Sequence, residues 1–158
     1  MEKALPSRKQ IHLKDFDYRS KFHVYFVTLC TADRHPLFLE NRIAKTIEEE
    51  LEFRRAKEIR LYCYCAMPDH LHVLLSLTDY PKKLQDWVSV FKRYTAKRIY
   101  ELYEVRPLWQ KNFYDRVVRK EESLRDMATY ILNNPVRKGI VSNWESYPYS
   151  KKVDPLPL

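Results

Sequence analysis

The sequence predicts an α+β fold with a ferredoxin-like βαββαβ core, in which two helices cover one face of a four-stranded antiparallel sheet, followed by an additional C-terminal helix. The order of the patterns is one reason: β-prone runs and helical repeats follow one another as strand, helix, strand, strand, helix, strand, helix. Size and composition are another, because 158 residues with 45% hydrophobic and 14% aromatic residues suit one globular domain. We therefore expect a single domain over residues 1–158.

The N-terminal third predicts an arm, a strand and a helix. Residues 1–20 are polar and charged, and we interpret them as a basic arm that carries Arg8 and Lys9. Residues 21–31 are rich in β-branched and aromatic side chains, which favours a strand. Residues 41–57 repeat apolar side chains at helical spacing and predict a helix.

The middle of the chain predicts a hairpin. Two apolar runs, 59–66 and 70–77, flank Met67-Pro68-Asp69, where Pro and Asp favour a tight turn. Because side chains alternate along a strand, His70 and His72 share one face. The opposite face of that strand is wholly apolar and predicts the core side: Leu71, Val73, Leu75 and Leu77.

The C-terminal half predicts two helices separated by a strand. Residues 81–103 carry one apolar stripe with Lys83, Arg93 and Lys97 on the far side, where they could equally be a solvated face. Residues 108–119 predict a turn followed by a strand, and residues 121–134 a helix that ends before Pro135. A short turn or helix at 136–141 and a C-terminal tail at 142–158 complete the chain.

Charge and composition narrow the function. Lysine and arginine outnumber acidic residues by 29 to 21, which gives a net charge of +8 and indicates a polyanionic partner such as nucleic acid, although a merely soluble basic protein has the same balance. The only glycine, Gly139, excludes glycine-rich phosphate loops. No apolar run has membrane-spanning length, and three cysteines without framework spacing fit a reducing compartment, so we expect a cytoplasmic protein without membrane contact.

His70 and His72 form a candidate metal site. Side chains at positions i and i+2 of a strand point the same way, so both imidazoles could reach one divalent cation. Two histidines on a sheet face could also be solvated polar positions. A metal site would need a third ligand from elsewhere in the chain.

A structural zinc site is an alternative for the same histidines. Cys63 and Cys65 would lie opposite His72 and His70 if the turn had four residues, making a Cys2His2 site conceivable. With a three-residue turn the cysteines would lie on the opposite face. The sequence does not decide this register.

Further candidates lie on the last predicted helix. Tyr130 and Asn134 are i, i+4 neighbours away from its apolar stripe, so both could face the histidines if the helix packs on the open face of the sheet. Taken alone, such a tyrosine is more typical of packing, and an asparagine before proline of a helix end.

The combination resembles a known family. Met67-Pro-Asp-His-Leu-His72, followed by Tyr130-Ile-Leu-Asn-Asn-Pro-Val-Arg-Lys-Gly139, is similar to the REP-associated tyrosine transposases, a branch of the single-tyrosine HUH (His-hydrophobe-His) superfamily. The resemblance covers about residues 25–149. It includes three further segments: Phe26-Val-Thr28, Leu108-Trp-Gln110 with Phe113-Tyr-Asp-Arg116, and Trp144-Glu-Ser-Tyr-Pro-Tyr149.

This resemblance implies a chemistry. His70, His72 and Asn134 would hold Mg2+ or Mn2+, and Tyr130 would be the nucleophile, carried by the additional helix. The substrate would be single-stranded DNA with hairpin or palindromic structure, cleaved through a 5′-phosphotyrosine intermediate by a monomer or homodimer. Tyr94, which basic residues surround, is a rival nucleophile that does not match the family's catalytic position.

The leading expectation is therefore a metal-dependent endonuclease and strand transferase. The alternative is a module that holds single-stranded nucleic acid by stacking and phosphate contacts without cutting it. In either case the basic clusters predict phosphate contacts from nine residues: Arg8, Lys9, Lys83, Arg93, Lys97, Lys111, Arg116, Arg119 and Lys120.

Overall fold

The computed structural model describes residues 23–78, 83–118 and 121–157. The predicted arm at 1–20, and with it Arg8 and Lys9, lies outside the described residues, as do Arg119 and Lys120.

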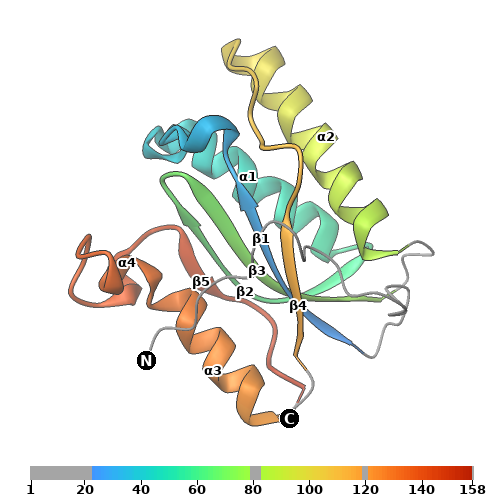
Figure 1. Ribbon diagram of the computed structural model, residues 1–158, viewed down its shortest axis with the longest axis vertical. Helices are drawn as coiled ribbons and strands as arrows, with labels where there is room; N and C mark the ends of the chain where they lie inside the picture. Colours follow the sequence, from blue (N-terminus) through green and yellow to red (C-terminus); the bar gives the residue numbers. More distant parts are fainter. Residues whose placement is uncertain (1–22, 79–82, 119–120, 158) are drawn as a thin grey trace.

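A five-stranded antiparallel sheet forms the centre of the fold (Figure 1). The strand order is β4-β1-β3-β2-β5, whose first four strands are the predicted ferredoxin-like core. The strands are β1 (Val24–Cys30), β2 (Ile59–Met67), β3 (His70–Leu77), β4 (Tyr114–Val118) and β5 (Ser150–Lys152).

The fifth strand corrects the sequence prediction, which placed these residues in a tail without a role in the sheet. β5 pairs with the outer edge of β2, with Ser150 opposite Cys65 and Lys152 opposite Cys63. Its three residues, Ser-Lys-Lys, have no β-branched or aromatic member, so propensity gives no signal there. Backbone pairing with β2 makes this segment a strand.

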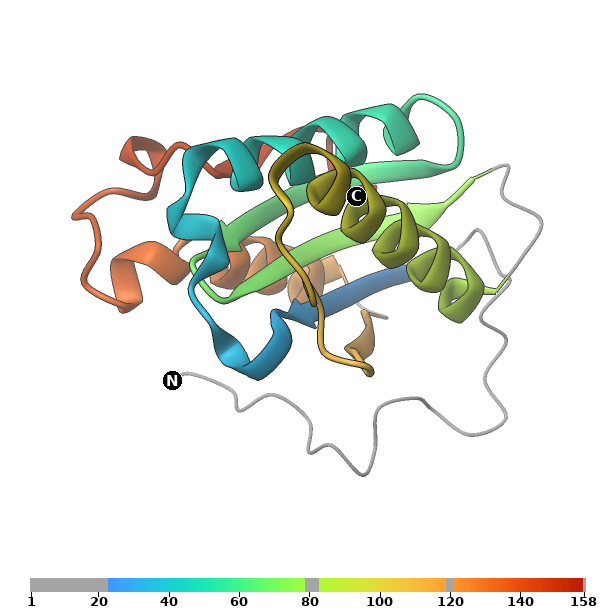
Figure 2. The same cartoon turned by 90° about the horizontal axis from the view of Figure 1, so that it is seen from above.

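The helices form two layers on opposite sides of the sheet (Figure 2). The helices α1 (Asn41–Arg55) and α2 (Leu84–Tyr103) cover one face, and α3 (Glu121–Leu132) packs against β2, β3 and β5 on the other. A short helix, α4 (Asn134–Arg137), follows α3 directly. Single 3-10 turns lie at Ala32–Arg34, Leu37–Leu39 and Trp144–Ser146.

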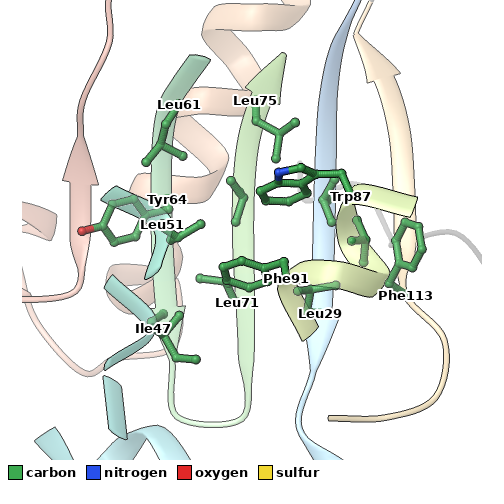
Figure 3. Packing of buried hydrophobic residues seen from close by; sticks show 14 of the residues in the cluster. Leu29, Ile47, Leu51, Leu61, Tyr64, Leu71, Leu75, Trp87, Phe91 and Phe113 are labelled. Carbon is green, nitrogen blue, oxygen red and sulfur yellow. The ribbon is translucent and has the colours of Figure 1, made fainter. Parts of the chain in front are cut away.

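The larger apolar core lies between the sheet and the α1–α2 layer (Figure 3). Leu71 and Leu75 of β3 face this core, as their alternation predicted, and Trp87 stacks on Phe91 with ring centroids 5.3 Å apart. Full burial of one such side chain is worth about 1.5–3 kcal/mol. This layer therefore fixes which face of β3 remains for the histidines.

Among residues 23–78, 83–118 and 121–157, no helix is long and apolar enough to cross a membrane.

Candidate active site

Helix α3 packs on the face of the sheet that carries the histidines. Met127 and Ile131 of α3 join Tyr62 of β2 and Leu74 of β3 in a second apolar cluster. The helix lies mainly over β2, β3 and β5, whereas Tyr114 and Arg116 at the β4 edge are half-buried. The predicted position of the last long helix, against the face opposite the core, is therefore what the structure shows.

The hairpin has a two-residue turn, Pro68-Asp69, which differs from both registers considered from the sequence. Met67 lies opposite His70, and Cys65 lies opposite His72. The pairing is continuous from Met67 to Cys63, and a bulge shifts the register between Cys63 and Leu61. Histidines and cysteines consequently share one face.

His70 is held by a carboxylate. Its Nδ1 lies 2.7 Å from Oδ1 of Asp69, and Oδ2 of Asp69 accepts a 2.9 Å hydrogen bond from Nε of Arg34. The hydrogen bond from His70 lowers the pKa of the Asp69 carboxyl to about 2, and Arg34 acts in the same direction. An ionised Asp69 accepts the Nδ1 proton of His70, which leaves the lone pair on Nε2.

His72 is held by a hydroxyl. Its Nδ1 lies 2.8 Å from Oγ1 of Thr28 on β1, and its side chain is only 1% exposed. Burial lowers the pKa of His72 well below its usual value, and the neighbouring His70 adds to this shift. The surroundings of His72 therefore favour the neutral imidazole, the form that ligates metals.

Asn134 closes the group from the other layer. Its Nδ2 lies 3.0 Å from Nε2 of His70, and its side chain is 3% exposed. The predicted helix over 121–134 is in fact two helices, because α3 ends at Leu132 and Asn134 begins α4. Pro135 lies in the first turn of α4, where a missing N–H does no harm.

Tyr130 lies beside the histidines. Its ring centroid is 6.0 Å from that of His72 and 6.0 Å from that of Phe26, while the rings of His70 and His72 are 4.5 Å apart. Four of the residues chosen from the sequence therefore meet in one place: His70, His72, Tyr130 and Asn134.

Arg137 belongs to this group, although the sequence interpretation missed it. Its guanidinium carbon lies 3.9 Å from the centroid of the Tyr130 ring, and its Nη2 donates a 2.6 Å hydrogen bond to the carbonyl of Tyr130. Helical spacing could not have indicated the pair, because the break after Leu132 separates the two residues. The presence of arginine within the Asn-Pro-Val-Arg motif was the only available signal.

The geometry does not fit the Cys2His2 alternative. Cys63 lies opposite Leu74, and both cysteines belong to the second apolar cluster. Among the residues that the structure describes, no three His, Cys, Asp or Glu side chains lie where they could hold one metal ion together.

Tyr94, the rival nucleophile, lies elsewhere. It is 46% exposed on α2, in the layer on the opposite side of the sheet from the histidines. Its ring lies against the guanidinium groups of Arg54 and Arg93, at 4.9 and 5.7 Å.

The described basic residues fall into two groups. Arg116 of β4 lies opposite Phe26 of β1, whose ring centroid is 5.1 Å from that of His72. Lys111 precedes β4, and its carbonyl accepts a hydrogen bond from Lys92 of α2. Lys83, Arg93 and Lys97 belong to α2 and its N-terminal flank in the opposite layer, and Lys97 pairs with Glu101 at 3.8 Å. Of these five residues, the structure thus places only Arg116 on the face of the sheet that carries the histidines.

Comparison with known proteins agrees with this picture. A family model described as transposase IS200 like matches residues 18–134. The REP-associated tyrosine transposase of Escherichia coli is 21% identical over 84% of this chain and 78% of its own length. An uncharacterized protein of Haemophilus influenzae is 27% identical over 82% of this chain and 88% of its own.

A solved structure shares the fold. It is described as a REP-associated tyrosine transposase bound to a REP hairpin, and it superposes with a TM-score of 0.66 at 20% identity, covering 88% of this chain and 82% of that one. The resemblance stated from the sequence motifs is therefore confirmed. Since the family model covers well over half of the chain, this protein belongs to the IS200-like family of transposases and is an enzyme of that class.

Proposed function

We propose that this protein is a metal-dependent single-stranded DNA endonuclease and strand transferase that acts at hairpin or palindromic sequences, with Tyr130 as the nucleophile. The observation that carries the proposal is the meeting of Tyr130 with His70, His72 and Asn134 from two separate layers. A relative solved with a REP hairpin supports the substrate class.

The side chains fit a divalent cation. Both histidines have Nδ1 occupied by a protein partner, which leaves Nε2 as the ligand atom on each. Within the described part of the chain, no three His, Cys, Asp or Glu side chains could hold a metal together, so the third ligand would be the amide oxygen of Asn134. Two imidazoles and one amide oxygen leave coordination positions for phosphate oxygens and water, which suits Mg2+ or Mn2+.

Asn134 would turn its amide over when the cation binds. In the present arrangement Nδ2 donates to the lone pair on Nε2 of His70. A cation takes that lone pair, and a half-turn of the amide then offers Oδ1 instead. The hydrogen bond thus marks where the third ligand stands.

The proposed reaction conserves the energy of the cleaved phosphodiester bond in a covalent bond between Tyr130 and the DNA. The phenolic oxygen of Tyr130 attacks phosphorus, a bond from phosphorus to Tyr130 forms, and the bond to the 3′ oxygen breaks. The proton of the tyrosine hydroxyl passes through solvent to the leaving oxygen, which gives a free 3′-OH and a 5′-phosphotyrosine. When bound, the cation supplies charge neutralisation at the phosphate. The phosphotyrosine can then join to another 3′-OH.

Formation of the covalent intermediate tests the proposal. The purified protein is incubated with Mn2+ and labelled single-stranded hairpins from DNA flanking its own gene, then run on a denaturing gel beside Tyr130→Phe and Tyr94→Phe. We expect a shifted band that only Tyr130→Phe abolishes. Tight binding on a native gel with no covalent band would instead favour a module that binds DNA without cutting it.

The metal is tested separately by titration with Mn2+, read by electron paramagnetic resonance of the free ion. We expect one ion per chain and an affinity at least tenfold lower in Asn134→Ala. Asn133→Ala is the matched control, because the side-chain amide of Asn133 donates a hydrogen bond to the carbonyl of Thr129 in α3. Equal affinity in the three proteins would remove Asn134 from the site.

A further inference from the structure

A polar pocket of about 570 Å³ lies next to the candidate site, between the 3-10 turn after β1 and the loop before β4. Arg34 and Lys111 supply two cationic groups, Tyr114 an aromatic ring, and Gln110 and Asn112 two amides. The volume lies in the range of sites for small ligands. None of the proposed catalytic roles uses this pocket.

Backbone hydrogen bonds hold the two walls together. The N–H of Ala32 donates to the carbonyl of Leu108 at 2.9 Å, and that of Gln110 donates to the carbonyl of Cys30 at 2.9 Å. From α2, the ammonium group of Lys92 donates to the carbonyls of Gln110 and Lys111. The pocket is thus part of the folded structure and needs no rearrangement to form.

The pocket is joined to both histidines. Arg34 lines the pocket and also binds Asp69, which holds His70. Tyr114 lies opposite Thr28, which in turn lies opposite His72, so these three side chains form one row on the same face of the sheet. A strand whose phosphate lies at the histidines would therefore extend toward this pocket.

The chemistry of the walls suits a nucleotide. Guanidinium and ammonium groups bind phosphate, an aromatic ring stacks on any base, and side-chain amides can both donate to and accept from a base edge. Asp33 is the only carboxylate of the lining, and the guanidinium of Arg34 is paired with Asp69 outside it, which leaves Lys111 as the second cation of the walls. Asp33 and Arg34 both have left-handed backbone, with φ of 52° and 57°, a costly conformation that is often found at functional sites.

We infer that this pocket receives one unpaired nucleotide of the DNA strand, adjacent to the phosphate that Tyr130 attacks, with its base on Tyr114 and its phosphate near Arg34 and Lys111. The inference rests on the proposed function, because it specifies where the DNA strand runs beyond the proposed catalytic residues. It gives the enzyme a contact to unpaired DNA that is separate from any contact to the hairpin stem.

The test compares two hairpins in a Tyr130→Phe background, where no cleavage occurs. One hairpin has unpaired flanks and the other ends flush with the stem. We expect Tyr114→Ala to weaken binding of the flanked hairpin about tenfold and to leave the flush hairpin unchanged, since stacking on one aromatic ring is worth about 1–3 kcal/mol per base. Tyr114→Phe should behave like the parent, and Tyr94→Ala is the control for a tyrosine in the other layer.

Fluorescence of 2-aminopurine, placed at each unpaired position in turn, identifies the bound nucleotide. We expect quenching at one position, lost in Tyr114→Ala and kept in Tyr114→Phe. If the parent bound flanked and flush hairpins equally and no position were quenched, the proposed role of the pocket would be overturned. The covalent-band experiment could still support the nuclease in that case. An equal loss for both hairpins in Tyr114→Ala would show a structural role and would also overturn it. If the parent bound neither hairpin, both proposals would fall.

Discussion

The guanidinium of Arg137 lies 3.9 Å from the centroid of the Tyr130 ring and is tied by a 2.6 Å hydrogen bond to the carbonyl of the same tyrosine. One side chain thus contacts both the ring and the backbone of the proposed nucleophile. A planar cation over an aromatic face contributes about 0.5–2 kcal/mol, and here it restrains the direction in which the hydroxyl points.

Arg137→Ala is therefore expected to slow strand cleavage about tenfold or more while changing hairpin affinity much less, because the ring loses its restraint. Single-turnover rates at saturating enzyme, compared with binding constants, separate the two effects. Lys138→Ala removes another exposed positive charge one residue along and is the control. Equal losses in the two variants would mean that only the charge matters.

Thr28 is expected to tune the metal site without touching the metal. Its hydroxyl, 2.8 Å from Nδ1 of His72, orients that imidazole. Thr28→Val keeps the shape but removes the hydroxyl, and we expect it to lower Mn2+ affinity by about 10–100-fold, whereas Thr28→Ser should stay close to the parent. The same Mn2+ titration provides the measurement, and an unaffected Thr28→Val would contradict this role.

The face of the histidines could be predicted from the sequence because alternation along a strand is a local property. Leu71 and Leu75 assign the core side of β3, and His70 and His72 then face the other way. The apolar stripe of α3 could likewise be predicted, from its helical spacing. These patterns need no knowledge of distant residues.

The register of the hairpin and the fifth strand were not predictable in this way. Pro68-Asp69 predicts a tight turn but not its length, and the register follows from the pairing of β2 with β3, in which Met67 lies opposite His70. β5 exists because the edge of β2 offers partners to Ser150, not because of its own side chains. The position of Arg137 beside Tyr130 was not predictable either, because it depends on the break between α3 and α4.

DNA affinity is expected to fall steeply with salt. Arg116 lies at the half-buried β4 edge on the same face as Phe26, so a strand bound at the site would place phosphate near it. Each lost phosphate contact lowers the slope of log affinity against log salt by about 0.7 for a single strand. Arg116→Ala should show this decrease, and Lys57→Ala, an exposed cation after α1, should not. A flat salt response of the parent would contradict phosphate binding altogether.

The last prediction concerns stability. Asp154, just after β5, accepts hydrogen bonds from Arg55 at 2.7 Å and from the N–H of Leu61 at 2.9 Å. Asp154→Ala leaves the N–H of Leu61 without this partner and should lower the free energy of unfolding, measured in urea at pH 7, by about 1–3 kcal/mol.

The same carboxylate makes stability depend on pH. The hydrogen bond from Arg55 lowers the pKa of Asp154, so the folded state binds this proton less readily than the unfolded chain. The stabilisation by the charge is thus complete above pH of about 4 and is lost as pH falls through the folded-state pKa. The difference between parent and Asp154→Ala should therefore shrink below pH 4. A difference that stayed constant down to pH 2 would show that the carboxylate charge contributes nothing.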